Sequence, residues 1–331
     1  MKKILVGITA VTAICFIIPI IFTKPFHTIE ISMTEEVQEN NQEEKYTYSK
    51  YGSIRLFHSK TSEVEELPID EYLYGVVCAE MPADFEMEAL KAQAVVARTY
   101  TIYKIENQSS KHENADICDD STCCQAWIAK EERFERWEED KREDYWSKIV
   151  SAVEETKGEY ISYEGKPINA FFHANSGGKT ESPFNVWGGN GYPYLQTVTT
   201  AGEDAYTQYQ SEAEYTFDEV REIIKQIHND FEIDFTKNDC IQILERTEGN
   251  RVKKIKFGNK SFEGTEIRNI FKLKSANFEV TLIEDKVRFE VFGYGHGVGM
   301  SQTGADSLAK QGIDYQEIIH HFYTNVEIKQ L

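Results

Sequence analysis

A glutamate at the end of a predicted helix is a residue whose type and place could support acid–base chemistry. Glu80 closes the segment PIDEYLYGVVCAEMP, in which Pro68 favours a helix start and Pro82 a helix end. Steps of three and four residues put Glu80 on the apolar side of this helix. Burial disfavours a charged carboxylate and raises its pKa, as a general acid working near neutrality requires. The simpler alternative is a glutamate that faces solvent or pairs with an arginine.

Two histidines stand in glycine-rich loops. His296 lies in GYGHGVGMSQTGA, between a predicted strand at 287–292 and a predicted helix at 303–310, and His173 lies in FFHANSGG. Glycine lets a ligand approach the main chain, and N–H groups beside a helix N-terminus suit a carboxylate or amide oxygen. We therefore expect the loops to bind substrate through a shared set of residues: His173, Ser176, Gly177, Gly178, Tyr294, His296, Gly297 and Gln302. The alternative is that the glycines only permit tight packing.

Other chemistries fit these loops poorly. Val298 stands where a dinucleotide-binding motif needs its third glycine, and the sequence has no Gly-Lys-Ser/Thr of a P-loop. A serine–histidine–aspartate site would need a Gly-x-Ser-x-Gly turn, which is also absent. Nucleotide binding and serine hydrolysis are therefore disfavoured.

A third cluster has the order H-x5-C-x4-C-C, from His112 to Cys124. Thiolates and an imidazole so close in sequence can converge on one Zn²⁺, which soft sulfur and nitrogen suit. A Cys118–Cys123 disulfide and free thiols are the alternatives. Because Cys123 and Cys124 are adjacent, we expect one of them to be a ligand. Such a metal would hold the loop together rather than take part in chemistry.

The elements that must position these residues are helices and strands in mixed order. A strong helical pattern over 86–105 follows Pro82, and its Lys91 and Arg98 are expected to reach toward Glu80 and bind substrate. Further elements are a strand at 53–59, amphipathic helices within 129–156 and a hairpin that turns at Glu164-Gly165-Lys166. We therefore predict an α+β fold whose strands and helices form a substrate groove. The stretch 202–284 shows no catalytic pattern and is interpreted as scaffold or partner surface; whether it forms a separate lobe stays open.

The N-terminus predicts a membrane anchor. Residues 4–23 carry no charge, and 20 helical residues span about 30 Å, the thickness of a bilayer's hydrocarbon core. Lys2 and Lys3 before this run predict a cytoplasmic tip at 1–3 and an extracytoplasmic remainder. The rival, a cleaved signal peptide, lacks an A-x-A-like site. We expect an acidic linker at 24–50 and one folded region at 51–331.

Composition narrows the function classes. The 331 residues are 40% hydrophobic, enough for a buried core, and carry a formal net charge of −20. Nucleic acid is an unsuitable partner, because its phosphates require a basic surface. The negative charge also weighs against an anionic polymer as substrate. For a cell-wall glycan substrate, it favours strands from which the acidic peptides have been removed.

Three motifs in this order resemble the stage II sporulation protein D family of membrane-anchored lytic transglycosylases. They are CAEMPADFEMEALKAQAVVARTY, AFFHANSGGKTES with VWGG and YPYLQTV, and GYGHGVGMSQTGADSLAKQG. The resemblance runs from about residue 51 to 331. It implies Glu80 as catalytic acid. It also implies a zinc site like that of clostridial members, with His112, Cys118 and Cys124 as ligands and Cys123 the weaker choice.

The family implies a function in sporulation. Its members cleave the bond from N-acetylmuramic acid to N-acetylglucosamine in glycan strands that a partner amidase has stripped of peptides, and they leave a 1,6-anhydro end. We expect the protein to span the mother-cell membrane once, with the catalytic region facing the intermembrane space. Its expected partners are the amidase and a membrane scaffold of engulfment. Two other classes stay open: a non-catalytic amidase enhancer that binds cell wall, and a zinc hydrolase of peptide cross-links.

Overall fold

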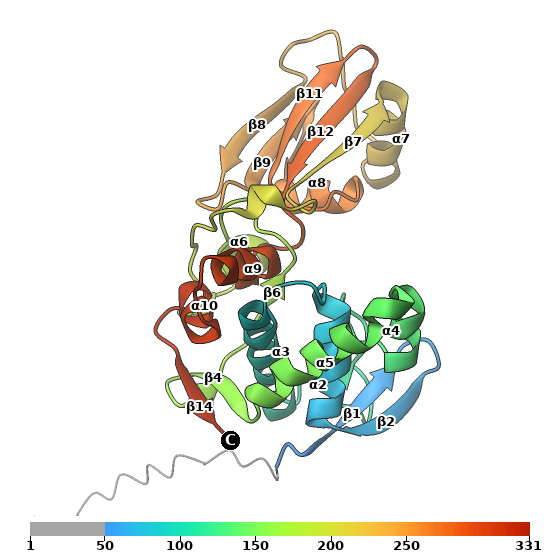
Figure 1. The fold of residues 1–331 in the computed structure, drawn as a ribbon. Helices are drawn as coiled ribbons and strands as arrows, with labels where there is room; N and C mark the ends of the chain where they lie inside the picture. Colours follow the sequence, from blue (N-terminus) through green and yellow to red (C-terminus); the bar gives the residue numbers. More distant parts are fainter. Residues whose placement is uncertain (1–49) are drawn as a thin grey trace, which may run out of the picture. The chain divides into compact units, whose positions relative to one another are not determined.

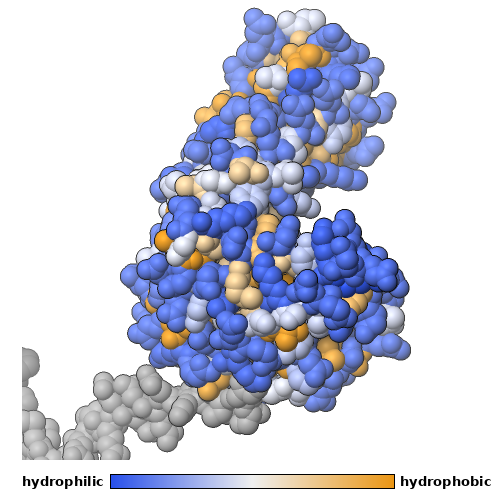
Figure 2. Space-filling model, in the orientation of Figure 1, coloured by the Kyte–Doolittle hydropathy of each residue, from blue (hydrophilic) through white to orange (hydrophobic). Residues whose placement is uncertain are grey.

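The computed structural model describes residues 50–331, which belong to one compact unit. The predicted tip, anchor and nearly all of the linker therefore lie outside the described residues. Between residues 50 and 331, no helix combines the length and apolar character needed to cross a membrane. The face drawn in Figure 2 is mainly hydrophilic, with hydrophobic side chains in scattered groups.

A central helix organises the first hydrophobic core. Helix α3 (Met87–Glu106) buries nearly every residue from Ala89 to Ile102, and α2 (Ile69–Glu80) and α5 (Arg142–Glu155) pack against it. Small alanines along α3 allow these close approaches. Figure 1 shows the three helices side by side. The turn between α2 and α3 contains Pro82, as the sequence predicts.

Short strands and helices surround these three helices. The strands form the sheets β2-β1-β3 and β14-β4-β5 and the pair β13-β6, in which β13 and β6 run parallel. The elements are β1 (Ser53–His58), β2 (Glu63–Pro68), β3 (Ile117–Cys118), α4 (Lys130–Arg136), η1 (Glu139–Lys141), β4 (Glu159–Tyr163), β5 (Lys166–Pro167), β6 (Phe172–His173), α6 (Pro183–Trp187), η2 (Glu203–Ala205), β13 (Met300–Ser301), α9 (Gln302–Lys310), α10 (Tyr315–Phe322) and β14 (Glu327–Gln330).

A second hydrophobic core lies within the segment 210–292, which we call the inserted lobe. Its sheets have the strand orders β11-β12-β7 and β10-β9-β8. Its elements are β7 (Gln210–Thr216), α7 (Phe217–Ile227), β8 (Ile241–Arg246), β9 (Val252–Phe257), β10 (Lys260–Glu263), α8 (Gly264–Ile270), β11 (Phe278–Ile283) and β12 (Lys286–Phe292). The core residues, from Val220 to Val291, are separate from those around α3.

The inserted lobe leaves and rejoins the rest of the chain at one place. The Gly293 amide donates to the Tyr209 carbonyl at 2.6 Å, so the ends of the lobe are adjacent. The expected end at residue 284 falls short, because β12 pairs with both β11 and β7 and completes their sheet. The mixed α+β class is as predicted.

The ladder β13–β6 brings the two histidine loops together. His173 is paired in register with Ser301, and an isolated antiparallel bridge joins Asn175 to Tyr294. Residues about 120 positions apart in sequence thus share one short piece of sheet. This arrangement positions the candidate site.

Candidate functional site

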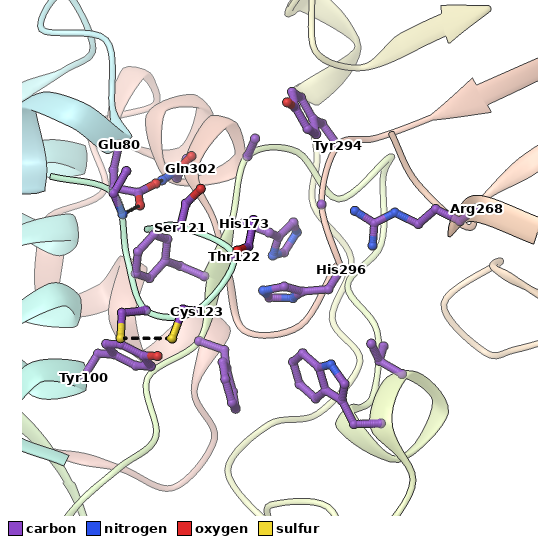
Figure 3. A pocket seen from close by; sticks show the side chains of 18 of the residues that line it. Glu80, Tyr100, Ser121, Thr122, Cys123, His173, Arg268, Tyr294, His296 and Gln302 are labelled. Carbon is purple, nitrogen blue, oxygen red and sulfur yellow. Dashed lines mark hydrogen bonds between the residues drawn. The ribbon is translucent and has the colours of Figure 1, made fainter. Parts of the chain in front are cut away.

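One cavity brings together the acid and both histidines. It holds about 900 Å³, enough for sugar units. Six of the predicted site residues line it: Glu80, Cys124, His173, Tyr294, His296 and Gln302. In Figure 3, Glu80 and Gln302 lie on one side, Arg268 lies on the other, and the two histidines lie between them.

Glu80 is the last residue of α2, where the helix stops before Pro82 and its side chain faces the cavity. The Ala126 amide donates to Oε1 at 2.6 Å, and Gln302 Nε2 donates to Oε2 at 3.2 Å. Burial raises the pKa of Glu80 above its ordinary value, while these two hydrogen bonds oppose the rise. The predicted shelter of this carboxyl is therefore present, and the solvent-facing alternative is not what the structure has.

The two histidines are uncharged near neutrality. Burial lowers the pKa of His173 to about 3 and that of His296 well below its ordinary value. His173 Nδ1 lies 3.2 Å from the Val298 carbonyl, so this nitrogen carries the proton and Nε2 is an acceptor. The buried Nε2 has no protein partner among the described residues. It is therefore free to accept a hydrogen bond from a ligand.

Glycine permits the close approach of the two loops at two positions. A Cβ atom on Gly295, whose φ is +113°, would lie 2.8 Å from the Cβ of His173. A Cβ atom on Gly299 would lie 1.9 Å from the Phe171 carbonyl oxygen. Side chains here would separate the histidines. These glycines thus permit tight packing and, by the same close approach, shape the candidate site.

Ser176, Gly177 and Gly178 do not line the cavity, contrary to our expectation. The amides of Ser176 and Gly178 donate to the carboxylate of Glu203 at 3.0 and 2.9 Å, and the Gly177 amide donates to Asn175 Oδ1 at 2.8 Å. The protein's own carboxylate thus occupies the place where we expected a ligand. These residues shape the loop instead of contacting a substrate.

Glu203 joins three separate segments. It is 1% exposed, and besides the two amides it accepts hydrogen bonds from four hydroxyls: Ser176, Thr200, Ser301 and Thr303. Ser301 is also the cap of α9, since its hydroxyl accepts from the Gly304 amide. Glu203 therefore fixes the His173 loop to the start of α9.

Gly297 is also outside the cavity lining. A Cβ atom there would lie 2.2 Å from Arg251 Nη2, so the glycine makes room for the guanidinium. That guanidinium donates to the Ser176 carbonyl at 2.7 Å. Gly297 thus has a packing function, and the expectation of a direct substrate contact is wrong.

The structure also corrects the expectation for Lys91 and Arg98. Lys91 pairs with Glu155 at 2.7 Å, and Arg98 is fully buried, donating to the Val153 and Glu159 carbonyls at 3.2 Å each. Both lie on the side of α3 that packs against α5 and β4, and neither lines the cavity. Their positive charges stabilise the helical packing.

The cysteine cluster is assembled as a possible metal site. Ligand atoms of His112, Cys118 and Cys123 lie within 4.8 Å of one another. Cys123 thus stands where the resemblance placed Cys124, and the geometry favours it as the third ligand. A turn at Asp120, whose carbonyl accepts from both adjacent cysteine amides, points the Cys123 thiol toward His112 Nε2 at 4.0 Å.

Cys124 stays close to this group. Its thiol lies 3.9 Å from that of Cys123, and a hydrogen bond from Cys118 lowers the pKa of Cys124. All five cysteines of the described residues are free thiols, so the disulfide alternative is not what the structure has. One imidazole and two or three thiols form a donor set that fits Zn²⁺.

Sequence reasoning missed several residues of the cavity. Trp187, 51% exposed, has its ring centroid 5.1 Å from that of His296. Thr265, Arg268 and Asn269 of α8 also line the cavity, although we expected only scaffold or partner surface there. No local motif marks α8; its place in the site depends on how the inserted lobe folds.

Comparison with known proteins shows which proteins this chain is related to. Residues 57–163 match the family model described as Stage II sporulation protein (SpoIID), and residues 195–299 match one described as Domain of unknown function (DUF8618). The chain is 32% identical over 280 residues to Stage II sporulation protein D of Bacillus amyloliquefaciens, which covers 84% of this chain and 79% of the relative.

Two further relatives come from Bacillus subtilis (strain 168). The alignment with its Stage II sporulation protein D is 29% identical over 341 residues and covers 100% of this chain and 96% of the relative. Its Amidase enhancer is 27% identical over 301 residues, which covers 76% of this chain and 39% of that protein. These relatives place the chain among sporulation proteins. It belongs to the stage II sporulation protein D family.

Proposed function

We propose that this protein is a membrane-anchored lytic transglycosylase of peptidoglycan that acts during engulfment in sporulation. One observation carries the proposal: among the described residues that line the cavity, Glu80 is the one carboxylate. A hydrolytic glycosidase needs a second carboxylate, about 5 to 9.5 Å from the first. A transglycosylase needs only one, because the 6-hydroxyl of the muramic acid itself attacks the anomeric carbon.

The surroundings of Glu80 suit both halves of this reaction. A raised pKa favours the protonated form of the carboxyl, which can donate its proton to the leaving glycosidic oxygen. The resulting carboxylate is stabilised by the Ala126 amide and Gln302, and takes the proton of the 6-hydroxyl as the anhydro ring closes. His173 is too weak a base to replace it, with a pKa of about 3.

The histidines and Trp187 are suited to binding the strand. The free Nε2 of His173 accepts a hydrogen bond from a hydroxyl or acetamido N–H, and the exposed ring of Trp187 offers a stacking surface to a sugar. Binding at several points fixes the glycosidic oxygen beside Glu80.

We further propose a structural Zn²⁺ held by His112, Cys118 and Cys123, with Cys124 as the candidate fourth ligand. A bound zinc would fix the loop between Cys118 and Ala126. Ser121, Thr122 and Cys123 of that loop line the cavity, and the Ala126 amide contacts Glu80. The metal would thereby support the catalytic carboxyl without touching substrate.

Location and partners are proposed from the sequence. Residues 4–23 would span the mother-cell membrane once, with the cavity facing the intermembrane space, beside a partner amidase and the membrane scaffold of engulfment. The acidic linker would hold the folded region away from the membrane surface.

Mass spectrometry of peptide-free glycan strands after digestion tests the function. We expect 1,6-anhydro-muramic acid ends from the wild-type protein. Plain reducing ends would replace the proposal with a hydrolase, and peptide fragments lost on chelation would indicate a zinc hydrolase.

A second candidate is a non-catalytic amidase enhancer, which the 27% identity to a protein named Amidase enhancer favours. It predicts no glycan product, together with an increased rate of a partner amidase that survives the substitution Glu80→Gln.

A further inference from the structure

Arg268 is a cation at the cavity wall that has no acidic partner among the described residues. Its Nε donates to the Leu273 carbonyl at 3.3 Å, while no carboxylate among residues 50–331 pairs with its guanidinium. Burial lowers its pKa, which reflects the cost of holding this charge away from water. In a chain of net charge −20, an arginine left unpaired in a cavity indicates an anion that comes from outside.

Within the large cavity, the neighbours of Arg268 add no negative charge. Glu181 lies with Arg268 on a smaller pocket, and its carboxylate accepts hydrogen bonds from the Ser182 amide and Asn185. His173 and His296 are neutral, and the positive charge of Arg268 helps, after burial, to keep them so. Lys274 Nζ lies 5.1 Å from the ring centroid of Tyr294, which lines the cavity. Among the described residues of the lining, the one acidic group is Glu80, on the other side of the cavity in Figure 3. An anion bound here would meet positive charge and hydrogen-bond donors.

The proposed substrate carries such an anion in only one of its states. The muramic acid has a lactyl group on its ring, which ends in a free carboxylate once the peptide has been removed. While a peptide is attached, the same carbon forms a neutral amide. A guanidinium binds a carboxylate through two parallel hydrogen bonds and cannot bind an amide in that way.

Resting on the proposed function, we infer that Arg268 recognises the free lactyl carboxylate and thereby selects glycan strands without peptides. The inserted lobe, part of a domain of unknown function, then contributes to substrate selection, because α8 carries the specificity-determining arginine to the cavity. The amides of Ser176, Gly177 and Gly178 in the His173 loop cannot take this role, because Glu203 and Asn175 already occupy them.

The test compares two forms of one peptide-free glycan, with its lactyl groups either free or converted to methylamides. For the wild type we expect kcat/KM for anhydro-end release to be about 10- to 100-fold higher on the free form, the range of one charged hydrogen-bonded contact. Arg268→Gln should lose this preference and keep its rate on the methylamide form. Arg268→Lys should keep part of the preference, and Lys254→Gln, which removes an exposed charge of the same lobe, should keep all of it.

Two outcomes overturn the inference: a wild type without preference, or an Arg268→Gln variant whose rate falls equally on both forms, as a structural role predicts. If the wild type cleaves neither form, the proposed function fails while Arg268 can still be judged. Calorimetric binding of the two forms to the wild type and to Arg268→Gln then decides. A preference for the carboxylate that depends on Arg268 supports the inference, and equal binding overturns it.

Discussion

At the scale of single residues, the pKa of Glu80 determines when the proposed acid carries its proton. Burial raises this pKa, whereas the donors Ala126 and Gln302 stabilise the ionised form and lower it. A general acid is active below its pKa, so glycan cleavage should decline as pH rises through the elevated value. The same shift makes the stability of the fold depend on pH. The protonated, buried carboxyl contributes its full stability below the ordinary glutamate pKa, and this contribution is lost as pH rises through the raised pKa.

Removing one of these hydrogen-bond donors should shift the pH at which glycan cleavage declines. In Gln302→Leu, the ionised Glu80 loses a hydrogen bond, its pKa rises further, and the alkaline limb of kcat/KM should shift to higher pH. Gln311→Leu is the matched control, since Gln311 lies outside the cavity and donates to the Ser307 carbonyl. A limb of Gln302→Leu that stays in place or moves to lower pH would show that Glu80 does not set it.

At the scale of elements, the cysteine loop supports the site by forming part of the cavity wall. Cys118→Ser should lower bound zinc from about one ion per chain to near zero and reduce thermal stability and glycan cleavage together. Zinc content by elemental analysis and unfolding by calorimetry are the measurements. Cys240→Ala removes a thiol of the inserted lobe and should leave zinc unchanged. Full zinc content in Cys118→Ser would rule out this ligand set.

Glu203 connects the His173 loop with α9, so its loss should destabilise both. Glu203→Ala leaves buried donors without an acceptor and should lower the free energy of unfolding by about 3 kcal/mol or more. Asp204→Asn, on the exposed neighbouring residue, should change it by less than about 0.5 kcal/mol. Urea unfolding measures both. Equal stability of Glu203→Ala and wild type would contradict the assigned role.

Elements with strong local signals were predictable from sequence, and those fixed by distant contacts were not. The apolar steps and Pro82 locate α2 and its terminal Glu80, and the glycine motifs locate the loops of His173 and His296. The faces of α3 were assigned wrongly, because α5 and β4, which bury Lys91 and Arg98, come some 50 residues later.

Glu203 and Arg268 gave no signal of their own. Neither stands in a recognisable motif, and each obtains its role from segments that only the folded chain brings near. For the same reason, sequence alone could not decide whether Cys123 or Cys124 is the third zinc ligand. That choice depends on the turn at Asp120, which orients the two cysteines. A pattern identifies residues that could do chemistry, whereas non-local packing decides which of them meet.

At the scale of the molecule, Arg251 connects the inserted lobe to the site. It is 4% exposed, and its guanidinium donates across to the Ser176 carbonyl at 2.7 Å. Arg251→Leu should remove buried hydrogen bonds between the two cores and lower stability by about 3 to 5 kcal/mol. Lys253→Leu, an exposed change two residues further along in β9, is the control.

Two probes can show whether the cores also separate. All four tryptophans lie outside the inserted lobe, so their fluorescence follows the α3 core, while far-ultraviolet circular dichroism also follows the lobe's strands. The two transitions should coincide in the wild type and diverge in Arg251→Leu. Coincident transitions at wild-type stability would show that Arg251 does not connect the cores.

The most direct measurement is the count of anhydro ends that Glu80→Gln releases from peptide-free glycan, beside wild type and Glu86→Gln. An amide cannot give up the proton that the leaving oxygen needs, so Glu80→Gln should lose about 10³-fold in rate while it still binds the glycan and keeps its fold. Glu86, exposed at the start of α3, should be replaceable without loss. Anhydro ends released by Glu80→Gln at the wild-type rate would contradict a mechanism based on this one carboxyl.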